Sequence, residues 1–189
     1  INPYRGCEHG CVYCFARPTH AYYGLSPGLD FETRLFYKPD AAALLRRELR
    51  EPGYRPDVIA MGTNTDPYQP VEREIGLTRA ILEVLREFHH PVSIVTKSTL
   101  ILRDVDILAD MAAQGMASVC LSVTTLDRRL ARLMEPRAPT PARRLDAIKE
   151  LNAAGIPTGA LVAPIIPALN DMDLDRVVDA VAAAGATSA

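Results

Sequence analysis

Residues 152–165, NAAGIPTGALVAPI, place a glycine directly after an alanine-rich helix end and directly before an apolar run. A glycine at this position accepts the left-handed backbone that closes the last turn of a helix. The same pattern occurs at Ala112–Gly115, which precedes the apolar run Ala117–Thr124, and again at Ala182–Gly185. The repetition predicts helices that alternate with buried strands, and a further strand expected after Gly185 would lie beyond the end of the given chain.

The same alternation extends toward the N-terminus. Asp57–Gly62 and Val92–Thr96 are short apolar runs of the length expected for buried parallel strands. Helices are predicted at Asp40–Glu51, Glu72–His89, Arg103–Gln114, Pro141–Ala154 and Asp173–Ala184. The chain is therefore predicted to be an α/β protein with a parallel sheet and right-handed crossovers. Whether the sheet is open or closes toward a barrel stays undecided at this point, but in both cases the loops after the strands form the functional rim.

Composition limits the possible classes of protein. The 189 residues fit one domain, 1–189, with 48% hydrophobic and 23% charged residues and a net charge of −2. This charge indicates no general nucleic-acid or membrane surface, although a local basic groove is compatible with it. The longest apolar stretch, Ile156–Leu169, contains three prolines and is shorter than the roughly 20 residues of a membrane span.

We expect a cytoplasmic protein with reduced thiols. We also expect a fragment, because the chain starts at Ile1 and stops shortly after Gly185.

Three of the four cysteines form a C-x3-C-x2-C motif at Cys7, Cys11 and Cys14. Thiolates this close together can hold one metal centre, and iron–sulfur clusters are commonly bound through cysteine sulfur. Three ligands on a four-iron cluster would leave one iron open to chelate a small molecule and to pass it an electron. The alternative is a structural zinc site, which usually needs four protein ligands. Cys120 lies in an apolar run, typical of a buried thiol, and His9 is expected to face solvent or to lie beside the centre.

This motif, with Tyr13 directly before the third cysteine, resembles the radical S-adenosylmethionine superfamily. The resemblance implies a partial, TIM-like (β/α) barrel, truncated on its C-terminal side, whose first strand carries the cysteine loop. It implies a 4Fe–4S cluster on Cys7, Cys11 and Cys14, with S-adenosylmethionine bound to the open iron. It further implies an enzyme that generates a 5′-deoxyadenosyl radical, acts on an unidentified substrate, and takes electrons from a donor such as flavodoxin or ferredoxin.

The resemblance also assigns cofactor contacts to the predicted rim. Gly62, Thr63 and Asn64 stand where the superfamily carries a glycine-rich motif for the methionyl amino group, although the usual Gly-Gly-Glu is absent. A turn-forming surface loop is the alternative for the whole segment Gly62–Glu72. The remaining candidates for cofactor binding are polar or aromatic side chains near strand ends: Tyr13, Asp66, Ser122, Thr124 and Arg144.

Physical reasons support some of these candidates. Ser122 and Thr124 share one face of a strand, and their hydroxyls would suit a ribose or a carboxylate. Arg144 could clamp the methionyl carboxylate, because a guanidinium matches a carboxylate at two points. Lys97 ends a predicted strand and is either solvated or part of the site. Asn170 either lies on the rim or caps the following helix.

Four blocks resemble a narrower branch, the DNA repair photolyase-like proteins related to spore photoproduct lyase: Asn2–Pro18, Gly62–Glu72, Val95–Ser98 and Glu135–Pro136. This resemblance implies a lyase with DNA as a partner. Spore photoproduct lyase, however, uses a further cysteine between its cluster and the middle of its barrel, and this chain has none from Phe15 through Val119. A non-catalytic iron–sulfur or zinc module for electron transfer or protein contact is the alternative function.

Overall fold

The computed structural model describes all residues, 1–189, and has a parallel sheet at its centre. The sheet has four strands in the order β3-β4-β5-β6, with bounds Ile59–Met61, Val92–Thr96, Ala117–Ser122 and Thr158–Leu161. Because the spatial order follows the chain order and all neighbours are parallel, a crossover leads from each strand to the next. The predicted parallel sheet is confirmed.

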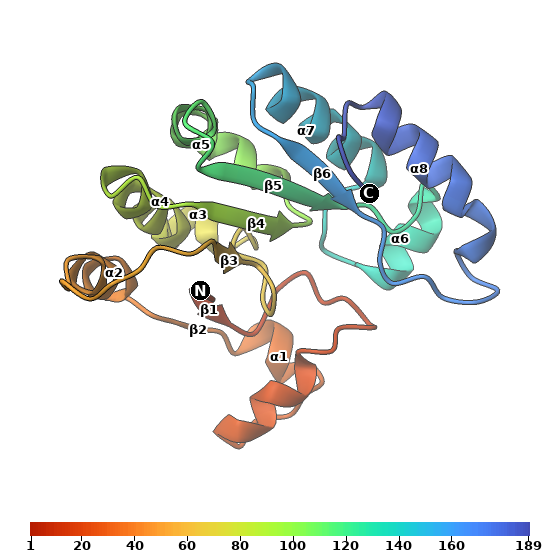
Figure 1. Cartoon of the computed structure of the whole chain (residues 1–189). Coiled ribbons are helices and arrows are strands. Elements are labelled where there is room, and N and C mark those ends of the chain that lie inside the picture. Colours follow the sequence, from red (N-terminus) through yellow and green to blue (C-terminus); the bar gives the residue numbers. More distant parts are fainter.

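Helices cover one side of this sheet. The longer ones are α2 (Ala41–Leu49), α4 (Leu77–Glu87), α5 (Val105–Ala112), α7 (Pro141–Ala153) and α8 (Leu174–Ala183). They succeed one another around the sheet in chain order, as in the wall of a partial (β/α) barrel (Figure 1). Shorter helical segments are η1 (Arg17–Tyr23), α1 (Asp30–Thr33), α3 (Glu72–Ile75), η2 (Thr99–Asp104), α6 (Arg128–Met134) and η3 (Asp171–Asp173). None of the helices combines the length and the apolar character needed to cross a membrane.

The core lies between the strands and these helices. Val92, Ile94 and Thr96 of β4 are buried, in the alternation expected of one strand face, and Ile81 and Leu85 of α4 are fully buried against the same core. Burying each of these large aliphatic side chains contributes about 1.5–3 kcal/mol. The packing fixes the strand ends, from which the site residues project.

The N-terminal segment lies outside this sheet. β1 (Tyr4–Arg5) pairs antiparallel with β2 (Phe36–Tyr37), and the cysteine loop follows β1 directly. The first strand therefore carries the cysteine loop as expected, but it lies outside the four-stranded parallel sheet. Residues 1–37 lie below the sheet in Figure 1, and Tyr4 packs into the same hydrophobic core as the strands.

The differences from the prediction include a divided helix, a shortened strand and a missing helix cap. The helix predicted over Glu72–His89 is two helices, α3 and α4, because Gly76 adopts φ 67° between them. The strand predicted over Ile156–Ile165 is only Thr158–Leu161, flanked by prolines that cannot donate a ladder hydrogen bond. Asp40 precedes α2 at the capping position, but its side chain makes no capping hydrogen bond.

The helix-ending glycines behave as predicted. Gly115, Gly155 and Gly185 have φ values of 71°, 75° and 98°. After Gly185 the chain turns back beside β6, where the Thr187 amide donates to Thr158 O at 2.9 Å. Residues 186–189 form no strand, but they run along the outer edge of β6, where the Ala160 amide donates to Ser188 O at 2.8 Å.

Candidate functional site

A pocket of about 580 Å³ lies at the carboxyl ends of β3, β4, β5 and β6. The cysteine loop closes one side of it, with Cys7, Cys11, Tyr13 and Cys14 in the wall. The opposite wall consists of strand ends: Gly62, Thr63, Asn64, Asp66, Val95, Thr96, Lys97, Ser122, Leu161, Ala163 and Pro164. The functional rim predicted after the strands is therefore a concave site that also includes the cysteine motif.

The three cysteines of the motif are free thiols on this wall. Cys7 and Cys11 are buried and Cys14 is half-buried. Burial raises the pKa of Cys7 well above its usual range. Burial also raises the pKa of Cys11 to about 11, against the charge of Lys97, which acts in the opposite direction. Cys7 and Cys11 would have to lose their protons to hold a metal centre, because only thiolates are ligands.

The donor set fits an iron–sulfur group in its chemistry. Three sulfur ligands border one pocket, and soft thiolates are the usual ligands of iron–sulfur clusters. No group of three His, Cys, Asp or Glu side chains in the structure is close enough to hold a single metal ion. The residues therefore fit an iron–sulfur cluster because three thiols line one pocket wall, and they do not surround a single metal ion.

Two arginines hold the backbone of the cysteine loop. Arg17 donates to the carbonyls of Gly10 and Cys11, each at 3.0 Å. Arg137 donates to the carbonyl of Glu8, and both guanidiniums pair with Glu32. The loop path is therefore set by protein contacts that engage its carbonyl groups.

The segment after β3 holds the loop from the other side. The amide group of Gln69 donates to Gly6 O at 3.1 Å and accepts from the Glu8 amide at 2.9 Å. The Thr65 hydroxyl donates to Tyr4 O at 2.8 Å. Thr65 and Gln69 are buried, so this segment is not the surface turn that the sequence left open.

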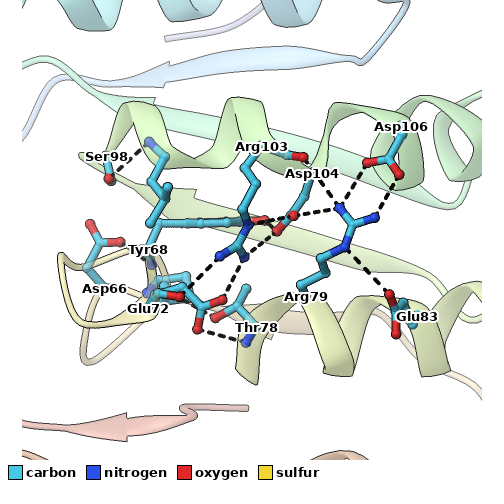
Figure 2. A network of polar contacts seen from close by, with 12 residues as sticks. Asp66, Tyr68, Glu72, Thr78, Arg79, Glu83, Ser98, Arg103, Asp104 and Asp106 are labelled. Atoms are coloured by element: carbon cyan, nitrogen blue, oxygen red, sulfur yellow. Dashed lines mark hydrogen bonds and ion pairs between the residues drawn. The ribbon is translucent and has the colours of Figure 1, made fainter. Parts of the chain in front are cut away.

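A buried polar network anchors this segment to α4 and η2 (Figure 2). Glu72 accepts hydrogen bonds from the Tyr4 hydroxyl and, at 2.9 Å, from the Thr78 amide. Arg103 pairs with Glu72 at 2.7 Å and with Asp104 at 2.8 Å. These contacts join the strand before the cysteine loop to the helices outside the sheet, so the loop and the sheet form one packed unit.

Asp66 joins the cysteine loop to the end of β4. Its carboxylate accepts from Thr96 Oγ1 at 2.7 Å and from the Lys97 amide at 2.8 Å, and it lies 3.1 Å from His9 Nε2. Burial opposes ionisation of Asp66, but His9 and the hydrogen bonds outweigh it and lower the pKa to about 2. His9 is 2% exposed, so the expectation that it faces solvent is wrong, and its Nδ1 has no partner.

Glu135 is the centre of a second buried network. Its carboxylate accepts from the Tyr13 hydroxyl, from Thr124 Oγ1 at 3.0 Å and from Arg144, and Lys97 Nζ lies 3.9 Å away. Burial opposes its ionisation, but the charges of Arg144 and Lys97 and the donated hydrogen bonds outweigh it, and they lower the pKa of Glu135. Through Tyr13, this carboxylate fixes the part of the loop between Cys11 and Cys14.

Two of the residues predicted to bind the cofactor are not in the pocket wall. The Thr124 hydroxyl is bound to Glu135. The Arg144 guanidinium is buried and donates to Glu135, to Pro139 O at 2.8 Å and to Ser122 O at 3.0 Å. Their positions therefore indicate support of the wall rather than contact with a ligand. Cys120 also lies outside the wall, on β5, with its Sγ toward Gly159 of β6.

Sequence reasoning gave no role to Glu135 and Gln69, and left that of Lys97 open. The sequence names Glu135 and Gln69 only as members of the blocks that resemble the photolyase-like branch, and no local pattern marks Glu135 as buried. Asn170 is buried too, and its side chain donates to Thr124 O at 2.8 Å and Pro164 O at 2.9 Å instead of capping a helix. These residues connect segments that are far apart in the chain, so only the fold brings out their role.

Gly62 offers a direct test of the geometry at the end of β3. Its φ is 87°, and a Cβ atom there would lie 1.9 Å from Val95 O. We expect Gly62→Ala to destabilise the chain by more than about 3 kcal/mol, since left-handed strain and a clash with backbone add together. Urea denaturation measures this change.

Gly76→Ala separates strain from clash. Gly76 has φ 67°, but a Cβ atom there meets nothing within 4 Å. Gly76→Ala should therefore lower the free energy of unfolding by only about 1–2 kcal/mol, which is the backbone strain alone. Equal costs for the two variants would contradict the close approach of Gly62 to β4.

Comparison with known proteins agrees with this arrangement. The sequence profile of the Radical SAM superfamily matches residues 1–181. An uncharacterized protein of Mycobacterium tuberculosis is 46% identical over 189 residues, which are 99% of this chain and 56% of that protein. An uncharacterized protein of Methanocaldococcus jannaschii is 31% identical over 173 residues, which are 92% of this chain and 62% of that protein. The chain thus spans little more than half the length of the mycobacterial relative.

Solved structures show the same fold. A spore photoproduct lyase variant with bound AdoMet and dinucleoside spore photoproduct superimposes with a TM-score of 0.66 at 20% identity, covering 99% of this chain and 52% of that one. Another variant of spore photoproduct lyase gives a TM-score of 0.60 at 21% identity, covering 95% of this chain and 52% of that one. With the profile match over nearly its whole length, the chain belongs to the radical S-adenosylmethionine superfamily.

Proposed function

We propose that this chain is the cofactor-binding part of a radical S-adenosylmethionine enzyme. In this proposal Cys7, Cys11 and Cys14 hold a 4Fe–4S cluster, and S-adenosylmethionine occupies the rest of the pocket. The observation that carries the proposal is the shared pocket, in which three free thiols face the ends of four parallel strands. When bound, these cofactors supply one-electron reduction and a 5′-deoxyadenosyl radical.

The chain's own residues bind, orient and exclude water. Gly62, Thr63 and Asn64 form the part of the wall proposed for the methionyl amino group, and the Ser122 hydroxyl is proposed for the ribose or the carboxylate. Tyr13 presents its ring to the pocket, because its hydroxyl is bound to Glu135. Lys97 takes the place that we expected for Arg144 as the cation in the wall, with its Nζ 5.8 Å from the centre of the Tyr13 ring.

Anaerobic reconstitution with iron and sulfide tests this proposal. We expect about four irons per chain, and 5′-deoxyadenosine after reduction in the presence of S-adenosylmethionine. A colourless protein with one tightly held zinc would overturn the proposal. The alternative, a non-catalytic iron–sulfur or zinc module, requires that S-adenosylmethionine does not bind and that His9→Ala or Cys120→Ser releases the metal.

A lyase that acts on a DNA photoproduct is the narrower form of the proposal. It is supported by the sequence blocks shared with the photolyase-like branch. The half-buried Cys120 lies outside the pocket and is no substitute for the further cysteine of spore photoproduct lyase. If the reconstituted protein leaves irradiated thymine-containing DNA unchanged, the lyase form fails while the radical chemistry stands.

The partners and the compartment follow from the same proposal. A reducing donor such as flavodoxin or ferredoxin would supply the electron. A cytoplasmic location would keep the four thiols reduced.

A further inference from the structure

A second pocket, of about 600 Å³, lies over α6. Three arginines of this helix, Arg128, Arg129 and Arg132, line it, together with Glu135 and the turn that leads to Thr140. Residues 128–144 contain six arginines and a single acidic residue, although the whole chain has a net charge of −2. Positive charge is therefore concentrated at this one place.

The guanidiniums of Arg128, Arg129 and Arg132 take part in no ion pair and no hydrogen bond, and all three residues are exposed. The neighbouring Arg137 and Arg144 differ, because each pairs with a carboxylate. Glu135, at the edge of the pocket, does not neutralise the three arginines, since its carboxylate is bound to Arg144, Tyr13 and Thr124. The arginines in this pocket thus keep their full donor capacity.

This arrangement carries an energetic cost for the helix. Arg128 and Arg132 are four residues apart on a helix of seven residues, and like charges at this spacing are destabilising. The side chain of Asp127 accepts from the amides of Arg129 and Leu130 at 2.6 and 3.0 Å, so it serves as the N-terminal cap. A bound anion would relieve the repulsion between the arginines.

We propose that the pocket over α6 is a binding site for a phosphate group, carried by a nucleic-acid strand or by a free nucleotide. Arginine matches phosphate with two parallel N–H donors, which lysine cannot do, and all the cations in this pocket are arginines. The pocket wall also includes Leu133, Ala138 and Pro139, an apolar surface that suits the sugar or base beside a phosphate. The site is separate from the pocket proposed for the cofactors.

The position of the site links it to the cysteine loop. Glu135 lines the arginine pocket and binds Tyr13, which lines the other pocket. The Val12 amide donates to Met134 O at 2.9 Å, and α6 lies at the same end of the sheet as the cysteine loop (Figure 1). A ligand held by its phosphate at α6 would therefore lie beside the proposed cofactor site. The phosphate site itself does not depend on the proposed function, so each can fail without the other.

Fluorescence anisotropy with a labelled thymidylate strand of about 12 nucleotides tests the nucleic-acid source. We expect Arg128→Gln/Arg132→Gln to weaken binding at least about tenfold and to reduce the slope of log affinity against log salt by about 1.4. The matched control, Arg47→Gln/Arg73→Gln, removes the same charge from exposed arginines that make no ion pair, and should change affinity less than about twofold.

Isothermal titration calorimetry with inorganic phosphate and with AMP tests whether the phosphate group belongs to a free nucleotide. If AMP or phosphate binds and the arginine-pocket variant abolishes this binding, while the strand does not bind, the site is one for a free nucleotide or phosphate. The proposal is overturned if none of the three probes binds, or if the control variant weakens binding as much as the pocket variant. Both experiments use the chain with and without reconstituted iron, so failure of reconstitution leaves them valid.

Discussion

Serine in place of Cys7, Cys11 or Cys14 is expected to remove the iron from the reconstituted chain and to reduce formation of 5′-deoxyadenosine by more than about a hundredfold. All three thiols line one pocket, and each is proposed as one of only three protein ligands. Loss of one leaves two, too few to retain a four-iron cluster. Iron content and visible absorbance after reconstitution measure the loss.

The matched control is Cys120→Ser. This thiol is half-buried on β5, outside the pocket, so the variant should retain iron and activity. Two results would contradict the proposed ligand set: retention of iron by a variant of the three-cysteine motif, or loss of iron from Cys120→Ser. The comparison therefore separates a ligand effect from a general effect of removing a thiol.

Glu135→Gln is expected to destabilise the chain by about 3–5 kcal/mol, because it leaves the buried charge of Arg144 without its partner. The side chains of Glu135 and Arg144 are 0% and 2% exposed, so water cannot compensate for the loss. Urea denaturation gives the change in the free energy of unfolding. As a control, Glu87→Gln removes the ion pair with Arg46 on the surface and should cost less than about 1 kcal/mol.

The same pair predicts a dependence on pH. The folded-state pKa of Glu135 lies below that of an unfolded glutamate, so its contribution is present above the unfolded pKa and is lost as pH falls through the folded value. The acid side of the stability profile should therefore be flatter in Glu135→Gln than in the parent.

Adding Arg144→Met to Glu135→Gln should recover part of the lost stability, because the unpaired charge is then removed. A cost below about 1 kcal/mol for the single variant, or no recovery in the double variant, would contradict a buried ion pair.

Much of the fold could be predicted, because apolar runs and helix-end residues act through interactions between neighbours in the chain. The strand predicted at Val92–Thr96 is β4 residue for residue, since a short apolar run is itself the condition for a buried strand. The first-turn proline Pro141 begins α7 as expected. Gly76, in contrast, looked like part of a continuous helix, because a helical spacing of apolar residues does not reveal a left-handed residue between two helices.

The site was predictable only where it depends on the motif and the strand ends. The three cysteines could be named from their spacing, and Gly62, Thr63 and Asn64 from the family resemblance and their place after a strand, where a parallel sheet brings its carboxyl ends together. All six line one pocket. His9, Glu135 and Arg144 could not be placed, because an isolated charged or polar side chain is normally solvated. Each is buried by a partner more than eight residues away, and such pairs leave no local signal.

The hydrogen bonds between Thr65, Gln69 and the segment Tyr4–Glu8 bear on whether the chain can fold before a metal centre is assembled. Small zinc domains fold only when their metal arrives, because nothing else orders their ligands. Here protein contacts shape the three-thiol loop, so folding of the chain need not wait for assembly of an inorganic centre. We therefore expect the chain to fold before iron and sulfide bind, and to stay folded when they are removed.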